Sequence, residues 1–163
     1  MLQNFPLGPL GELKVKDIRH LLVENPASVS SDTSVRDVMQ KMTNDLRTRQ
    51  VYVVDDDKHL LGAVRMGSVV ELLFPFDAIL QLNDSPYVAY IPKTGAKTAA
   101  DLMISPPVRV TEETTLGQMA GLLMKEGINE VPVVDEHEHL IGQVNMYEAI
   151  NAYLATERGH LAD

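Results

Sequence analysis

An internal repeat constrains the fold of this chain more than any other feature. Residues 51–55 and 60–64 (VYVVD and LLGAV) return as residues 131–135 and 140–144 (VPVVD and LIGQV), a constant shift of 80 positions. The apolar positions of the helix upstream recur at a shift of 81: Val35, Val38, Met39 and Met42 match Leu116, Met119, Ala120 and Leu123. Because both copies have strands and amphipathic helices in the same order, the sequence predicts two similar halves related by a pseudo-twofold axis, with related clefts where the copies meet.

The composition is that of an ordinary soluble globular protein. The 163 residues are 45% hydrophobic and 23% charged, unlike those of a disordered chain. A single copy of roughly sixty residues would bury too little surface to be stable alone. We therefore expect the two copies to share one core and to form one pseudo-symmetric module.

Charge and hydropathy argue against several classes of partner. The formal net charge is −9, from 14 basic and 23 acidic side chains, which disfavours broad contact with nucleic acid or with an anionic membrane. No apolar run approaches the ~20 residues that a membrane-spanning helix needs, and residues 1–6 lack the pattern of a secretion signal. The absence of cysteine permits a reducing compartment, so we expect a cytoplasmic protein.

Turn residues and periodicity divide the chain into five segments. These are an N-terminal arm at 1–14, a first repeat at 15–74, an apolar connector at 75–97, a second repeat at 98–155 and a C-terminal tail at 156–163. Each repeat is predicted to run helix, strand, helix, strand, strand, helix, which places the chain in the mixed α/β (α+β) class. The predicted outer elements are a short helix at 17–22 and 98–105, a short strand at 28–30 and 108–110, and a closing helix at 68–74 and 147–154.

This order of elements, together with two motifs, resembles the cystathionine β-synthase (CBS) domain. The motifs are Val-Pro-Val-Val-Asp at 131–135, before a turn, and Leu-Ile-Gly at 140–142, after it. The second copy is the better match, since Tyr52 stands in the first copy where the family has proline. Two copies in register make the resemblance specific, although each motif alone is not.

The resemblance implies a sensor and not a catalyst. In that family, paired domains form one compact module that usually dimerises, and the clefts between the copies bind adenosine-containing ligands such as AMP, ADP, ATP or S-adenosylmethionine. Binding then adjusts a partner protein. We therefore expect a homodimeric, energy-sensing regulatory module with no required cofactor. In agreement, the chain has no cysteine nucleophile and no Gly-x-Ser-x-Gly elbow, so no enzyme is expected.

The resemblance also implies which residues bind the nucleotide. After the last strand, the family has Gly, two apolar residues, Thr or Ser, two further residues and Asp. At the two polar positions the second copy has Asn145 and Glu148, and the first has Arg65 and Ser68. Glu148 keeps a carboxylate for the ribose hydroxyls, so we expect the main site in repeat 2, whereas Arg65 could pair with a phosphate in repeat 1. The other residues implied for the repeat 2 site are Ile104, Ser105, Pro106, Asn129, Glu130, Val131 and Pro132.

Structural roles compete with these assignments. Ser68 and Glu148 are also favourable residues at the start of a helix. Two other functions stay open: a ligand-free dimerisation module, or scaffold, whose clefts are filled by its own side chains, and a divalent-cation sensor. Residues 55–57 (DDD), His137 and His139 are cation-binding residue types, but polar hairpin tips explain them better, and no metal site is expected.

Overall fold

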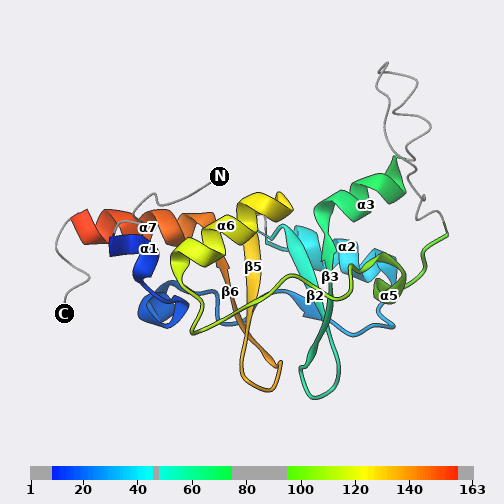
Figure 1. Ribbon diagram of the computed structural model, residues 1–163. Coiled ribbons are helices and arrows are strands. Elements are labelled where there is room, and N and C mark those ends of the chain that lie inside the picture. The colour runs from blue at the N-terminus through cyan, green and yellow to red at the C-terminus, as the bar shows by residue number, and fades with distance from the viewer. Residues whose placement is uncertain (1–8, 46–47, 75–94, 158–163) are drawn as a thin grey trace. The chain divides into compact units, whose positions relative to one another are not determined.

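The chain folds into two compact units (Figure 1). The structure is a computed structural model, and the residues it describes are 9–45, 48–74 and 95–157. Unit 1 consists of Met1–Pro26 and Val108–Asp163, and unit 2 consists of Ala27–Pro107. One unit is therefore continuous in sequence, and the other is assembled from the two ends of the chain.

Parts of three expected segments lie outside the described residues. These parts are residues 1–8 of the arm, residues 75–94 of the connector and residues 158–163 of the tail. In the described part of the arm, Pro9–Glu12 forms a short helix, α1, which the sequence pattern did not predict. At the other end, the closing helix continues to Glu157, beyond the predicted boundary.

Unit 2 is built on a three-stranded mixed sheet. β1 (Ser28–Val29) pairs parallel to β2 (Gln50–Val54), and β2 pairs antiparallel to β3 (Leu60–Arg65). All residues of β2 except Val54 are buried, as expected for the central strand of a covered sheet. The described helices of this unit are α2 (Val35–Thr43), α3 (Met66–Leu73) and α5 (Ala99–Leu102).

Unit 1 repeats this arrangement. β4 (Val110–Thr111) pairs parallel to β5 (Glu130–Val134), and β5 pairs antiparallel to β6 (Leu140–Asn145). The register is the same in both units, since Val131 opposes Val144 as Val51 opposes Val64. Its helical elements are α1, the 3-10 helix η1 (Val15–Leu21), α6 (Leu116–Glu126) and α7 (Met146–Glu157), and Figure 1 shows α1 beside α6 and α7. The predicted mixed α/β class and the repeated order of elements are confirmed.

The leading segment of each repeat lies against the strands of the other repeat. In unit 1, Val23 and Gln143 form an isolated bridge in which both N···O distances are 3.0 Å. In unit 2, Ile104 and Ala63 form the equivalent bridge, with N···O distances of 2.9 and 3.2 Å. The start of repeat 1 therefore completes the unit that holds the strands of repeat 2, and the start of repeat 2 completes the unit that holds the strands of repeat 1.

Each unit has its own cluster of buried apolar residues, where the sequence led us to expect a single shared core. The cluster of unit 1 contains Val15, Ile18, Val110, Leu116, Met119, Leu123, Val131, Val133, Val144 and Ala152. The cluster of unit 2 contains Val38, Met42, Val51, Val53, Val64, Val69, Ala99 and Leu102. The exchanged segments explain the difference, because Val15 and Ile18 of repeat 1 enter the first cluster and Ala99 and Leu102 of repeat 2 enter the second.

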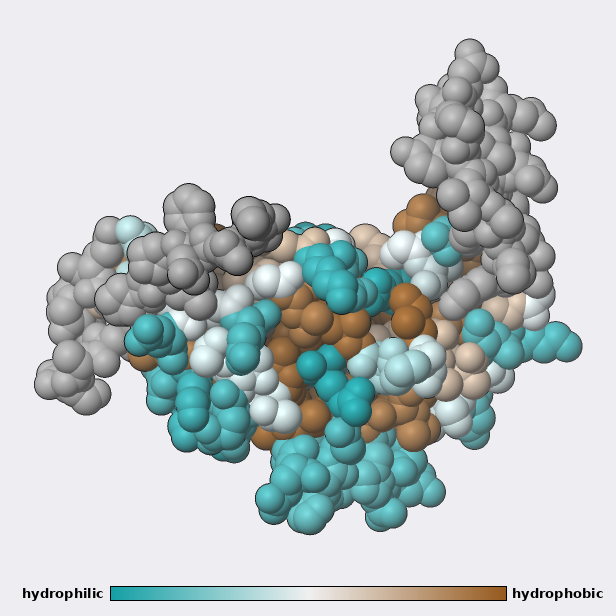
Figure 2. Space-filling model, in the orientation of Figure 1, coloured by the Kyte–Doolittle hydropathy of each residue, from teal (hydrophilic) through white to brown (hydrophobic). Residues whose placement is uncertain are grey.

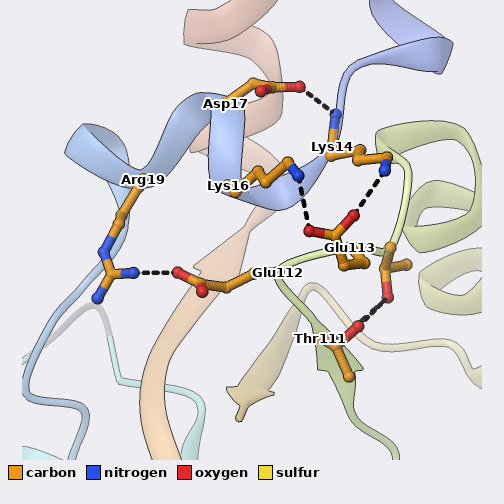
Figure 3. Close-up of polar contacts among 8 residues, drawn as sticks. Lys14, Lys16, Asp17, Arg19, Thr111, Glu112 and Glu113 are labelled. Atoms are coloured by element: carbon orange, nitrogen blue, oxygen red, sulfur yellow. Dashed lines mark hydrogen bonds and ion pairs between the residues drawn. The ribbon is translucent and has the colours of Figure 1, made fainter. Parts of the chain in front are cut away.

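Ion pairs accompany the exchanged segment in unit 1 (Figure 3). The Nζ atoms of Lys14 and Lys16 lie 2.6 and 2.7 Å from the two carboxylate oxygens of Glu113, and Arg19 pairs with Glu112. The backbone N–H of Lys16 also donates to the carbonyl of Glu112 at 3.0 Å. Hydrogen bonds from Lys14 and Lys16 lower the pKa of the Glu113 carboxyl to about 2. Charged and backbone contacts thus hold η1 against the turn that follows β4.

Local side-chain caps fix where α2 and α6 begin. The Ser34 hydroxyl accepts a hydrogen bond from the Asp37 amide at 3.1 Å at the start of α2. Thr115 and Gln118 form a reciprocal capping box at the start of α6, with distances of 3.0 and 3.1 Å. The longest described helix, α7, has 12 residues. Within the described ranges, no helix has both the length and the apolar character required to span a bilayer.

Candidate functional site

The end of β6 and the start of α7 bring Asn145 and Glu148 together. The Asn145 Oδ1 atom accepts hydrogen bonds from the amides of Tyr147 at 2.7 Å and Glu148 at 3.3 Å. In return, the Glu148 Oε2 atom accepts a hydrogen bond from the Asn145 amide at 2.6 Å. The two residues predicted to bind nucleotide thus form a capping box, the structural role that the sequence also allowed.

The other predicted residues of repeat 2 line the adjoining strand. Glu130 opposes Asn145 in the sheet register and is only 1% exposed. The Gln143 Nε2 atom donates to Glu130 Oε2 at 3.2 Å, and the carbonyl of Asn129 accepts from the Met146 amide at 3.0 Å. Unit 1 therefore brings together six of the predicted site residues: Asn129, Glu130, Val131, Pro132, Asn145 and Glu148.

The equivalent position in unit 2 has the opposite charge. Arg65 ends β3 and precedes α3, whose N-terminus has no side-chain cap and no acidic residue in its first turn. The Arg65 Nε atom is buried and has no hydrogen-bond partner within the described residues. Ser68, in that first turn, is 6% exposed. Helix α3 of unit 2 thus begins at a positively charged side chain, Arg65, whereas the first turn of α7 in unit 1 carries one carboxylate, that of Glu148.

The segment of Ile104, Ser105 and Pro106 lies in unit 2, not with Asn145 and Glu148 in unit 1. Ile104 is bridged to β3, and the Ser105 hydroxyl donates to the carbonyl of Leu61 on the same strand at 3.0 Å. The structure therefore groups this segment with the strand that ends at Arg65.

The counterparts of this segment in unit 1 are residues that sequence reasoning missed. A shift of 81 positions relates Ile104, Ser105 and Pro106 to Val23, Glu24 and Asn25. The bridge between Val23 and Gln143 brings these counterparts beside β6, the strand that ends at Asn145. The same shift was visible in the sequence and could have identified them, had the exchange of segments been known.

The two hairpin tips are self-contained polar turns, and Figure 2 shows them as hydrophilic surface at the lower edge of the view. The Asp135 Oδ1 atom accepts from the amides of His137 and His139 at 2.9 Å, and Oδ2 lies 2.9 Å from His139 Nδ1. Partial desolvation opposes ionisation of Asp135, but the hydrogen bonds from His139 outweigh it and lower its pKa to about 2. Asp55 and His59 repeat this geometry. Across the described ranges, no three His, Asp or Glu side chains are grouped so as to hold a metal ion.

Comparison with known proteins identifies the same family from sequence and from fold. The family profile described as CBS domain matches residues 15–75 and 99–155. A CBS domain-containing protein from Thermotoga maritima is 29% identical, with a TM-score of 0.69 over 86% of this chain and 94% of that chain. CBSX2, a CBS-pair protein from Arabidopsis thaliana solved in complex with AMP, is 25% identical, with a TM-score of 0.69 over 90% of this chain and 99% of that chain.

Two further relatives define the limits of the similarity. The CBS domain pair of protein MJ0100, solved with 5′-methylthioadenosine and S-adenosyl-L-methionine, has a TM-score of 0.66 at 19% identity, which concerns the fold alone. An inosine-5′-monophosphate dehydrogenase from Nitrosopumilus maritimus is 27% identical over 140 residues. The match covers 85% of this chain but 25% of that enzyme, so the chain spans about a quarter of the enzyme's length.

Proposed function

Because this chain belongs to the CBS domain family, we propose that it is a regulatory module that binds an adenosine-containing nucleotide and thereby modulates a partner protein. The AMP complex of CBSX2, 25% identical over 90% of this chain, supports an adenine nucleotide as the ligand. AMP, ADP and ATP are the candidates, acting as regulatory ligands and not as required cofactors. In this proposal the protein reports cellular energy state and catalyses no reaction itself.

The observation that carries this proposal is the start of α3. A helix N-terminus presents unpaired amides and a partial positive charge, which attract phosphate. No side chain caps that turn, although its first amide, that of Met66, donates to the Arg49 carbonyl at 3.0 Å. Arg65 adds a guanidinium whose buried Nε atom has no hydrogen-bond partner among the described residues. Ser68 adds a hydroxyl in the same turn. We therefore assign the phosphate to Arg65 and Ser68, a larger role than the sequence gave them.

The start of α7, in unit 1, offers a different chemistry. A carboxylate has two acceptor oxygens and can accept from both hydroxyls of a ribose. Glu148 uses Oε2 for the Asn145 amide, and this bond holds the carboxylate in a fixed orientation. We propose Glu148 and Asn145 as the ribose-recognition residues of unit 1, with residues 129–132 and, by the repeat shift, Glu24 and Asn25 around them. Ile104, Ser105 and Pro106 take the corresponding place beside Arg65 in unit 2.

We also propose that the protein is a homodimer. The closing helices of both units expose apolar side chains at positions related by the repeat: Val70, Leu73 and Phe74 on α3, and Ile150, Tyr153 and Leu154 on α7. Exposed fractions range from 41% to 59%, more than single scattered residues would require. Two equivalent apolar faces on one chain suit a twofold interface, in which each patch meets its own copy. The proposal includes a cytoplasmic location, which a chain without cysteine tolerates.

Calorimetric titration of the full chain with AMP, ADP, ATP and adenosine tests the nucleotide site. If Arg65 contacts phosphate, Arg65→Gln should weaken AMP binding at the unit 2 site by about tenfold or more, because a charge-assisted hydrogen bond is lost, and should leave adenosine binding unchanged. Glu148→Gln should weaken the binding of AMP and adenosine alike at the unit 1 site, since both contain the ribose. This variant keeps an acceptor for the Asn145 amide, so helix α7 keeps its cap.

Arg36→Gln is the matched control, because Arg36 is an exposed arginine on α2 of the same unit. This variant removes the same charge away from the site and should bind AMP as the parent does. The nucleotide proposal fails if none of the four ligands produces binding heat. The assignment of the phosphate fails if Arg65→Gln weakens adenosine binding as much as AMP binding.

A further inference from the structure

Unit 1 contains a cavity that is separate from the predicted nucleotide residues at the start of α7. Its volume is about 340 Å³, and its lining residues are Arg19, Leu22, Glu24, Asn25, Glu112 and Ile141. This volume falls within the range of small-molecule sites. Neither Asn145 nor Glu148 lines it, although two of its lining residues, Glu24 and Asn25, are the counterparts that the repeat shift relates to Ser105 and Pro106.

Backbone hydrogen bonds fix the walls of this cavity. The bridge between Val23 and Gln143 fastens the segment of Leu22 and Glu24 to β6. Gly142 permits this approach, because a Cβ atom there would come within 3.3 Å of the Val23 carbonyl oxygen. The Lys16 amide donates to the carbonyl of Glu112, another lining residue, at 3.0 Å. The cavity is therefore formed by segments that are tied together before any ligand binds.

The polar groups of the cavity include both signs of charge. Arg19 pairs with Glu112 (Figure 3), but a guanidinium has five N–H donors and can donate to a second acceptor. Glu24 is exposed and forms no ion pair with another described residue. Asn25 provides an amide beside it. Leu22 and Ile141 are partly buried and supply an apolar surface.

We propose that this cavity binds a free α-amino acid with an aliphatic side chain. The ligand carboxylate receives hydrogen bonds from Arg19, and the ammonium donates to Glu24 and to the Asn25 carbonyl oxygen. Leu22 and Ile141 contact the aliphatic side chain. The proposal shares Glu24 and Asn25 with the residues proposed around Glu148 in unit 1, but it uses neither Arg65 nor Glu148, and its test uses no nucleotide.

The charge of the cavity selects against other small ligands. Two carboxylates, Glu24 and Glu112, repel a phosphate or a simple carboxylic acid. An alkylamine would satisfy Glu24 but would leave the donors of Arg19 without an acceptor from the ligand. A ligand with an ammonium and a carboxylate on one carbon pairs with Glu24 and with Arg19 at the same time.

Two-dimensional amide NMR of the full chain, titrated with L-leucine, tests this proposal. We expect shifts of the amides of residues 19–25, Glu112 and Ile141 at millimolar ligand. N-acetyl-leucine, which lacks the ammonium, and isoamylamine, which lacks the carboxylate, should bind at least about tenfold more weakly, because each loses a charge-assisted hydrogen bond.

Matched variants separate the site from general charge effects. Arg19→Gln and Glu24→Gln should each weaken leucine binding by about tenfold. Lys125→Gln and Glu126→Gln remove the same charges from helix α6, where neither residue lines the cavity, and should change the affinity by less than about twofold. Glu24 is exposed, so its variant is expected to fold even if Arg19→Gln does not. The proposal is overturned if L-leucine causes no shifts, if the shifts lie elsewhere, or if N-acetyl-leucine binds equally well.

Discussion

The Sδ atom of Met103 lies 2.5 Å from the position that a Cβ atom on Gly62 would occupy. Gly62 belongs to β3 of repeat 1, and Met103 belongs to the leading segment of repeat 2. The Cγ and Cβ atoms of Met103 lie at 2.9 and 3.0 Å from the same position. The absence of a side chain at residue 62 therefore makes room for the segment that repeat 2 contributes to unit 2.

Gly62→Ala should destabilise the protein by about 1–3 kcal/mol, because the added methyl group overpacks this contact. Denaturant unfolding followed by circular dichroism measures the effect. In the double variant with Gly62→Ala, Met103→Ala should restore part of the lost stability, since it removes the Sδ and Cγ atoms that would collide with the new methyl group. Gly121→Ala is the control: a Cβ atom there meets nothing within 4 Å, and alanine in helix α6 should stabilise by about 0.5–1 kcal/mol. Equal effects at the two glycines would contradict this account.

Lys58→Gly should stabilise the protein by about 0.5–1 kcal/mol. Lys58 has a φ of 69°, a left-handed conformation that glycine adopts without the steric penalty of a Cβ atom. Glu138 occupies the same position in the other hairpin, with a φ of 66°, but its carboxylate also accepts a hydrogen bond from Arg109 at 3.0 Å. Glu138→Gly should therefore stabilise the protein less than Lys58→Gly does. Thermal unfolding of both variants measures the two changes in stability, and a larger stabilisation by Glu138→Gly would contradict this prediction.

Acidification should weaken the attachment of η1. The pKa of Glu113 is about 2 in the folded protein against 4.5 for the free side chain, so its ion pairs stabilise the fold fully above pH 4.5. That stabilisation is lost as the pH falls from 4.5 towards 2. Glu113→Gln should lower the stability at pH 7, match the parent near pH 2 and flatten the slope between them. Glu126→Gln, at a glutamate without an ion pair to another described residue, should leave the slope unchanged.

Asn145→Ala should destabilise the protein by about 1 kcal/mol, because the amides of Tyr147 and Glu148 lose their cap. The uncapped helix α3 offers the converse experiment. Arg65→Asn should introduce a cap there and stabilise the fold by a similar amount, while removing the guanidinium proposed to bind phosphate. Chemical denaturation measures both. Destabilisation by Arg65→Asn would mean that Arg65 has a structural role in the free protein.

The regular elements could be predicted because their signals are local. The β-branched run at residues 51–54 and its copy at 131–134 form strands within one residue of the predicted positions. The closing helices were predicted for the same reason, although α7 extends further than its apolar pattern. The short segments were harder. The predicted helix at 98–105 is a single turn, Ala99–Leu102, because Met103 already adopts an extended conformation.

The grouping of the candidate site residues could not be predicted, because it depends on which strand each leading segment joins. Nothing in the sequence of Ile104 and Ser105 distinguishes the strand of their own repeat from that of the other, since the two strands are nearly alike. The capping role of Glu148, by contrast, was predictable from its spacing of three residues from Asn145. The burial of the Arg65 Nε atom could not be predicted, because an arginine side chain at the end of a strand is usually solvated.

The reciprocal placement of the leading segments determines which parts of the chain could fold separately. Residues 27–107 contain all of unit 2. A single repeat, by contrast, contains a leading segment that packs in the other unit, and it lacks the leading segment that completes its own unit. A single repeat in isolation could complete its unit only by exchanging leading segments with a second molecule, whereas two repeats in one chain make that exchange within the chain.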